Sequence, residues 1–139
     1  MTPKPPTGIA IRRSIAQSLT SASLTADSIG HVSAYGIATI PDDPLEAQAI
    51  RDCLGDVPVT ALKSYFGNLG SGGGAVEAVA SVLALQQNEV PRTLNYETPD
   101  PACPVNVIHG ESLKDAKPVA MVLSQAGPGQ AAAMILSRD

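Results

Sequence analysis

Residues 57–87 read VPVTALKSYFGNLGSGGGAVEAVASVLALQQ and contain an apolar segment, a glycine-rich loop and an alanine-rich segment in that order. The β-branched residues of 57–62 predict a strand, with Pro58 near its start, where a missing N–H is tolerated. The loop at 67–74 holds five glycines and precedes a helix predicted at 75–87. The side chains predicted to face inward on this helix are Val76, Val79, Ala80 and Leu83. Because its other side chains are small, the helix is expected to pack closely on both sides and to be central.

The sequence on either side of this stretch continues the alternation of helices and strands. The further expected elements are a helix at 8–22, a strand at 29–34, a helix from Asp43, a short strand at 105–108, and a hairpin of 119–124 and 132–136 around Gly127-Pro128-Gly129. The resulting order, α-β-α-β-α-(β)-β-β, indicates an α/β fold with a mixed sheet packed with helices. Its length of 139 residues suits one domain over 1–139, with 1–7 as an extended, proline-containing lead-in.

The helix expected from Asp43 carries strong boundary signals. Asp43 can accept hydrogen bonds from free backbone N–H groups, Pro44 suits the first helical position, and Glu46 completes a capping-box pattern. Gly55 is placed to end the helix. Its buried stripe is predicted to comprise Leu45, Ala49, Cys53 and Leu54.

Composition narrows the function. Hydrophobic residues make up 44% of the chain and charged residues 16%, which is typical of a globular protein and not of a disordered one. A net charge of −4 and 3% aromatic residues argue against binding of nucleic acid. We expect no membrane segment and no signal peptide, and two cysteines without C-x-x-C spacing indicate a reducing, cytoplasmic location.

The glycine loop is the clearest candidate binding feature. Free N–H groups before a helix suit an anion, and residues 70–75 match the dinucleotide pattern G-x-G-x-x-A, with Glu97 at a suitable distance downstream. However, residues 63–66 separate the loop from its strand, and Glu97 lies in a proline-containing segment. We therefore favour the interpretation that the glycines let the following helix pack tightly.

Other chemically capable residues stand alone in the sequence. Lys63 follows a strand and could neutralise a carboxylate, although an exposed lysine is the commoner outcome, and Glu77 suits the first turn of a helix. His31 and His109 have no ligand-spaced partner, so we expect no metal and no cofactor. Cys53 and Cys103 lack an activating neighbour and are not predicted to be nucleophiles.

Several motifs resemble the C-terminal half of a β-ketoacyl-acyl-carrier-protein synthase (3-oxoacyl-ACP synthase II-like), a condensing enzyme of the thiolase fold. DSIGHVSAYGIAT at 27–39 is similar to a family strand ending in A-H-G-T-x-T, and DDPLEA at 42–47 to N-D-P-x-E-A. VPVTALKSYFGNL at 57–69 resembles V-x-x-x-K-S-x-x-G-H-L. GAVEA at 74–78, PRTLN at 91–95 and Asp100-Pro101 continue the match.

The resemblance also shows where this chain departs from the family. Two family histidines, which activate the malonyl unit, fall on Tyr35 and Asn68, while the family's lysine and glutamate are kept as Lys63 and Glu77. A glycine-phenylalanine-glycine segment is replaced around residues 125–129. Neither tyrosine nor asparagine can exchange a proton near pH 7 as imidazole does. The site is therefore expected to be degenerate, with Tyr35, Lys63 and Asn68 at its family positions and Glu77 in support.

The resemblance implies a further gap. The family's C-terminal half opens with a strand, which we expect to be central in its sheet, and this chain begins after it. Missing pairing partners would leave backbone groups unsatisfied, so we expect the chain either to belong to a longer or split protein or to close up or self-associate as a homo-oligomer.

Three functions remain open from the sequence. The leading interpretation is a domain that is inactive alone and serves as a structural or chain-length-factor-like partner in fatty acid or polyketide biosynthesis. The alternative is half of a working synthase whose nucleophilic cysteine comes from another segment or chain. The third is an anion- or nucleotide-binding module. Expected partners are an N-terminal condensing-enzyme half or synthase subunit, and acyl carrier protein. Carrier protein is acidic, and a small basic patch that could bind it comprises Lys4, Arg12 and Arg13. We prefer the simpler interpretation that these three residues belong to a solvated helix face.

Overall fold

The computed structural model describes residues 7–127 and 129–139. Its helices are α1 (Ile9–Ala22), α2 (Asp43–Leu54), α3 (Lys63–Phe66) and α4 (Gly73–Gln87), with short 3-10 turns η1 (Ala26–Ser28) and η2 (Gly70–Gly72). Its strands are β1 (His31–Ser33), β2 (Pro58–Thr60), β3 (Glu89–Val90), β4 (Asn106–Val107), β5 (Leu113–Lys114), β6 (Val119–Ala126) and β7 (Gln130–Ser137). The expected helices and strands are confirmed, including the two strands of the closing hairpin, whereas α3, β3 and β5 were not predicted. Pro128 of the predicted hairpin turn lies outside the described residues.

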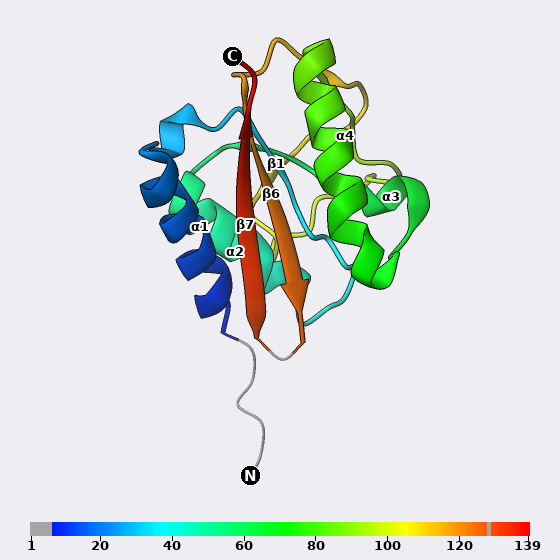
Figure 1. Ribbon diagram of the computed structural model, residues 1–139. Helices are drawn as coiled ribbons and strands as arrows, with labels where there is room; N and C mark the ends of the chain where they lie inside the picture. Colours follow the sequence, from blue (N-terminus) through cyan, green and yellow to red (C-terminus); the bar gives the residue numbers. More distant parts are fainter. Residues whose placement is uncertain (1–6, 128) are drawn as a thin grey trace.

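A five-stranded mixed sheet in the order β4-β2-β1-β6-β7 separates two helical layers (Figure 1). Helices α1 and α2 lie on one face, where α1 packs on β7 and on α2, and α4 lies on the other face against β6. The four strands β4, β2, β1 and β6 are parallel, and β7 is antiparallel to β6. All the parallel strands therefore present their carboxyl ends at the same edge.

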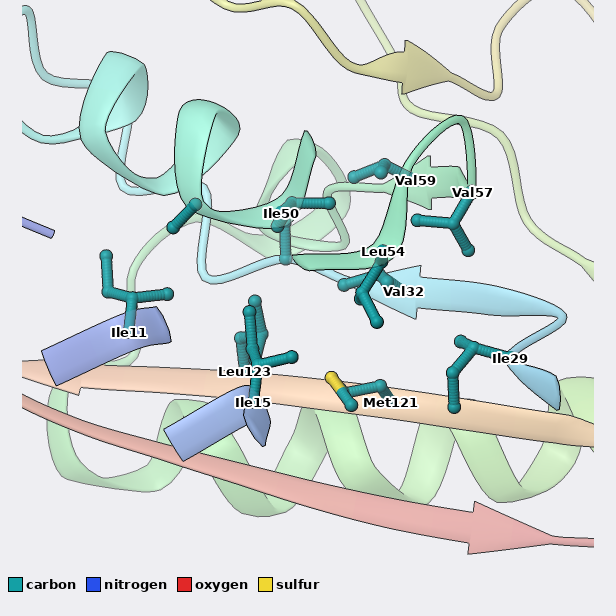
Figure 2. Close-up of a cluster of buried hydrophobic side chains, with 12 residues drawn as sticks. Ile11, Ile15, Ile29, Val32, Ile50, Leu54, Val57, Val59, Met121 and Leu123 are labelled. Carbon is teal, nitrogen blue, oxygen red and sulfur yellow. The ribbon is translucent and has the colours of Figure 1, made fainter. Parts of the chain in front are cut away.

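The main core fills the space between the sheet and the α1/α2 layer (Figure 2). Ile11 and Ile15 come from one face of α1, since residues four apart lie on the same side of a helix. Met121 and Leu123 reach the same core from β6, because alternate residues of a strand share a face. Ile15, Met121 and Leu123 are at most 1% exposed.

Helix α2 begins at the expected residue, but the predicted capping box is wrong. Asp42 occupies the cap position without a side-chain cap bond, and Asp43 Oδ1 accepts instead from Ala38 N–H at 3.1 Å. Glu46 turns away from its own helix and into the protein, where it is 4% exposed. Ala49 and Leu54 are buried as predicted, whereas Leu45 and Cys53 are only half-buried.

Helix α4 is oriented differently from the prediction. Val76, Val79 and Leu83, predicted to face inward, are 39%, 61% and 48% exposed. The buried side chains are instead Glu77, Ser81, Ala84 and Leu85, so one face of α4 packs on the sheet and the other is open. Because nearly every side chain of α4 is apolar or small, its sequence periodicity could not identify the inner face.

The sheet is continuous across its centre, which agrees with the expected alternative that the remaining strands close up. β1 pairs directly with β6 in parallel register, Val32 opposite Met121. Just before β1, the backbone of Gly30 lies very close to the backbone of Lys117, which precedes β6. A Cβ on Gly30 would lie 2.1 Å from the Lys117 carbonyl oxygen. Only glycine fits at that position. Residues 1–6 of the predicted lead-in lie outside the described residues.

Candidate functional site

Two sequence-predicted residues meet at the carboxyl edge of the parallel strands. Tyr35 follows β1 by two residues, and Lys63 follows β2 as the first residue of α3. β1 and β2 are adjacent and parallel, so both residues leave the sheet at the same edge. The Lys63 Nζ atom lies 4.0 Å from the centroid of the Tyr35 ring. This distance is within the range of a cation–π interaction.

Lys63 also forms a buried ion pair with Glu77. The Nζ–Oε1 distance is 2.5 Å, and the side chains of Lys63 and Glu77 are 7% and 0% exposed. Burial raises the pKa of Glu77, and the hydrogen bond and charge of Lys63 oppose this effect. Glu77 Oε2 has no hydrogen-bond partner within the part of the chain that the structure describes. Glu77 therefore does more than complement a helix dipole, because it fixes the Lys63 ammonium group.

Glu46 supports the loop that carries Tyr35. Its Oε1 accepts the Tyr35 backbone N–H at 2.8 Å, and its Oε2 accepts the Gly36 N–H at 2.9 Å. Burial raises the pKa of Glu46, and the two N–H groups oppose this rise. Gly36 has φ +48°, a left-handed conformation that favours glycine. The sequence contained Glu46, but its partners are ten and eleven residues away and became evident only in the fold.

Asn68 does not join this cluster through hydrogen bonds. It is exposed, and its Oδ1 accepts the Gly70 N–H at 3.0 Å, which is a local turn bond. Its side chain nevertheless lines a cavity that Lys63 also lines. The four site candidates therefore separate into a contact group of Tyr35, Lys63 and Glu77 and a peripheral Asn68.

The cavity has a volume of about 780 Å³ and lies between the loop after β1, the start of α2 and residues 93–107. Its lining is mainly apolar; the charged lining residues are Asp43, Glu46, Lys63 and Asp100. Cys103 also lines it, but burial together with Asp100, Asp43 and Glu46 raises the pKa of its thiol. Burial likewise raises the pKa of Cys53. Neither thiol has an environment that would activate it as a nucleophile.

The histidines lie apart from the Lys63 cluster. His31 is 1% exposed, and burial lowers its pKa to about 4. His109 packs its ring against Tyr96 with centroids 5.2 Å apart. Among residues 7–127 and 129–139, no group of three or more His, Cys, Asp or Glu side chains is arranged to hold a metal ion.

The glycine loop and the basic patch differ from expectation. A Cβ on Gly72 or Gly73 would meet nothing within 4 Å, and on Gly74 it would meet Ser124 Oγ at an ordinary 3.5 Å. The preferred interpretation, that the glycines permit tight packing, is therefore wrong for Gly72 and Gly73. Arg12 is paired with Asp52 at 2.7 Å, and Lys4 lies outside the described residues. The structure thus leaves Arg12 committed to an intramolecular pair.

The mixed sheet and its two helical layers are those of the C-terminal half of the thiolase-like fold. Within it, the sequence profile of the family "Beta-ketoacyl synthase, C-terminal domain" matches residues 1–97, and the chain belongs to this family. It is 36% identical over 111 residues to 3-oxoacyl-[acyl-carrier-protein] synthase 2 of Synechocystis sp., an alignment covering 77% of this chain and 27% of that synthase.

Two solved structures extend the comparison to the whole described fold. The ishigamide ketosynthase/chain length factor superposes with a TM-score of 0.92 and 31% identity, covering 99% of this chain and 34% of that one. A type II polyketide ketosynthase, solved with its acyl-carrier protein and bound to the hexaketide, gives a TM-score of 0.90 and 30% identity, covering 100% and 35%. The chain thus spans about a third or less of the length of these relatives. It is related to ketosynthases and chain length factors of fatty acid and polyketide synthesis.

No helix of the described residues is both long and apolar enough to cross a membrane.

Proposed function

We propose that this chain is a ketosynthase C-terminal domain that is inactive alone and acts as a structural, chain-length-factor-like partner of an N-terminal condensing-enzyme half or synthase subunit. The observation that carries the proposal is the occupation of the two family histidine positions by Tyr35 and Asn68. His31 and His109, the chain's two histidines, lie elsewhere, so no imidazole is next to Lys63 to take up a proton. We treat residues 1–139 as one domain.

The exposed face of α4 supports a partner of this kind. Its outward residues Val76, Val79, Val82 and Leu83 are 39–61% exposed, whereas Glu77, the single charged residue of α4, is buried. A solvated surface helix normally buries its apolar side chains and exposes its charged ones, and α4 does the opposite. The relatives are about three times as long as this chain. The remainder of a synthase is therefore the occupant we propose for the outward face of α4.

A second candidate is half of a working β-ketoacyl-ACP synthase that condenses an acyl thioester with malonyl-ACP. Its nucleophilic cysteine would come from another segment or chain, and Tyr35, Lys63 and Asn68 would act through hydrogen bonds. The retained Lys63–Glu77 pair favours this candidate. The exposed, locally bonded Asn68 and the contact of the Tyr35 ring with Lys63 favour the inactive role.

The deciding experiment measures decarboxylation of malonyl-carrier protein by the chain alone and by the chain mixed with a ketosynthase N-terminal half from the same genome. Complex formation is followed in parallel by light scattering. A stable complex without turnover supports the partner role. Turnover that is lost in Lys63→Ala but kept in Lys114→Ala, an exposed lysine, would establish the working half-enzyme instead. Failure to form any complex would contradict both.

A further inference from the structure

The Lys63 ammonium group is enclosed by two different side chains. Glu77 Oε1 accepts from it at 2.5 Å, and the Tyr35 ring lies 4.0 Å away, centroid to nitrogen. Only 7% of the Lys63 side chain remains exposed. Tyr35 itself is half-buried.

The aromatic ring can stabilise the part of the Lys63 positive charge that Glu77 does not neutralise by hydrogen bonding. Burying two charges costs free energy that one short contact does not recover unless the remaining donors also find partners. An ammonium group has three N–H donors, and one of them is directed to Glu77 Oε1. The negative face of a tyrosine ring can stabilise the remaining positive charge without accepting a conventional hydrogen bond.

The ring is held in place through its backbone. Glu46 accepts the N–H groups of residues 35 and 36 in a buried, two-oxygen contact. Gly36 is confined further by its left-handed φ and by Ala61, whose Cβ would lie 3.1 Å from a Cβ on Gly36. The backbone next to Tyr35 therefore has little freedom, which limits the directions from which its ring can approach Lys63.

We propose that Tyr35 covers the Lys63–Glu77 ion pair and closes the Lys63 amine to reagents and ligands, and that Glu46 is the residue that positions this cover. The inference goes beyond the proposed partner role, because it concerns the chain by itself. It assigns Lys63 to a closed ion pair in a cavity whose other charged lining residues are all carboxylates: Asp43, Glu46 and Asp100. Among the described residues, this cavity therefore offers no free cation to an anionic group.

The test is competitive acetylation of the folded chain with a small N-hydroxysuccinimide ester, read at each lysine by mass spectrometry. Lys114, which is exposed, serves as the internal reference. Lys63 is expected to react slowest in wild type and to stay protected in Tyr35→Phe, which keeps the aromatic ring. In Tyr35→Leu, which removes the ring, the Lys63/Lys114 labelling ratio should rise roughly five- to thirty-fold. Equal ratios in the Phe and Leu variants would overturn the proposal.

Two further variants distinguish a role of Glu46 in positioning Tyr35 from a role in the general stability of the fold. Glu46→Gln should raise the same ratio although Tyr35 is intact, while Glu111→Gln, an exposed matched control, should not. A Glu46→Gln variant that melts earlier but keeps the wild-type ratio would show a merely structural role. If the Leu variant does not fold, the wild-type spectrum still decides, because the Lys63 CεH₂ protons must show an upfield ring-current shift. All of these measurements use the isolated chain, so their outcome does not depend on whether the chain forms a complex with a partner.

Discussion

At the scale of single residues, the informative side chains are the buried polar ones. Glu46 and Glu77 were visible in the sequence, where the simplest roles for both were helix-start roles. In the fold they contact residues ten to fourteen positions away, at the loop after β1 and at Lys63. A carboxylate near a helix start can satisfy its own helix or a neighbouring segment. Which of these occurs depends on what the fold brings next to it.

The burial of His31 predicts that the free energy of unfolding falls at acidic pH. Its pKa falls from 6.5 to about 4 on folding because of burial. As pH drops below 6.5 the unfolded chain therefore binds a proton that the folded chain rejects, and stability is lost down to about pH 4. Between pH 7.5 and 4.5 this group should cost roughly 2–3 kcal/mol, measurable as a fall in the urea midpoint.

The matched comparison isolates His31 from other titrating groups. The raised pKa values of Glu46 and Glu77 act in the opposite direction, because their protonation favours the folded state as pH falls. His31→Gln should therefore reduce the loss of stability on acidification, whereas His109→Gln, at an exposed position, should leave it unchanged. An unchanged pH dependence in His31→Gln would contradict the assignment.

At the scale of elements, helix orientation depended on the distribution of apolar residues. In α1, Ile11 and Ile15 alternate with polar residues, so its inner face could be predicted. In α4, valines and alanines occur all around the helix, and the face that carries Glu77 and Ser81 turned out to be the inner one. Contact with β6 on one side, and the Lys63 partner for Glu77, decide the orientation.

Glycine positions supply a test at this scale. Gly30→Ala places a Cβ 2.1 Å from the Lys117 backbone oxygen and should destabilise the pairing of β1 with β6 by about 3 kcal/mol or more. Gly73→Ala, at the start of α4 with open space around its Cβ and φ −58°, should instead stabilise by roughly 0.5–1 kcal/mol. Thermal unfolding followed by circular dichroism would measure both. Similar effects of the two substitutions would refute the close approach.

At the scale of the whole molecule, the open face of α4 is expected to determine assembly. Val79→Lys places a charge at its most exposed apolar position, so binding to a ketosynthase N-terminal half should weaken roughly ten- to a hundred-fold. Stability of the chain alone should change by less than about 0.5 kcal/mol, because Val79 is at the surface. Calorimetric titration measures the affinity. Ala16→Lys, at an exposed position of α1, is the control and should bind normally; equal weakening by both would place the contact elsewhere.

The amino-acid sequence by itself determined the order of the main elements and the family resemblance, and it selected Tyr35, Lys63, Asn68 and Glu77 as site candidates. These depend on local patterns, namely periodicity, turn residues and short motifs, which a chain carries without its fold. Tertiary structure alone decided that β1 pairs with β6, that α4 exposes its valines, and that Glu46 accepts the backbone N–H of Tyr35, whose ring lies next to Lys63. Each of these depends on contacts between distant segments, and their free energies depend on burial, which exists only once the chain has folded.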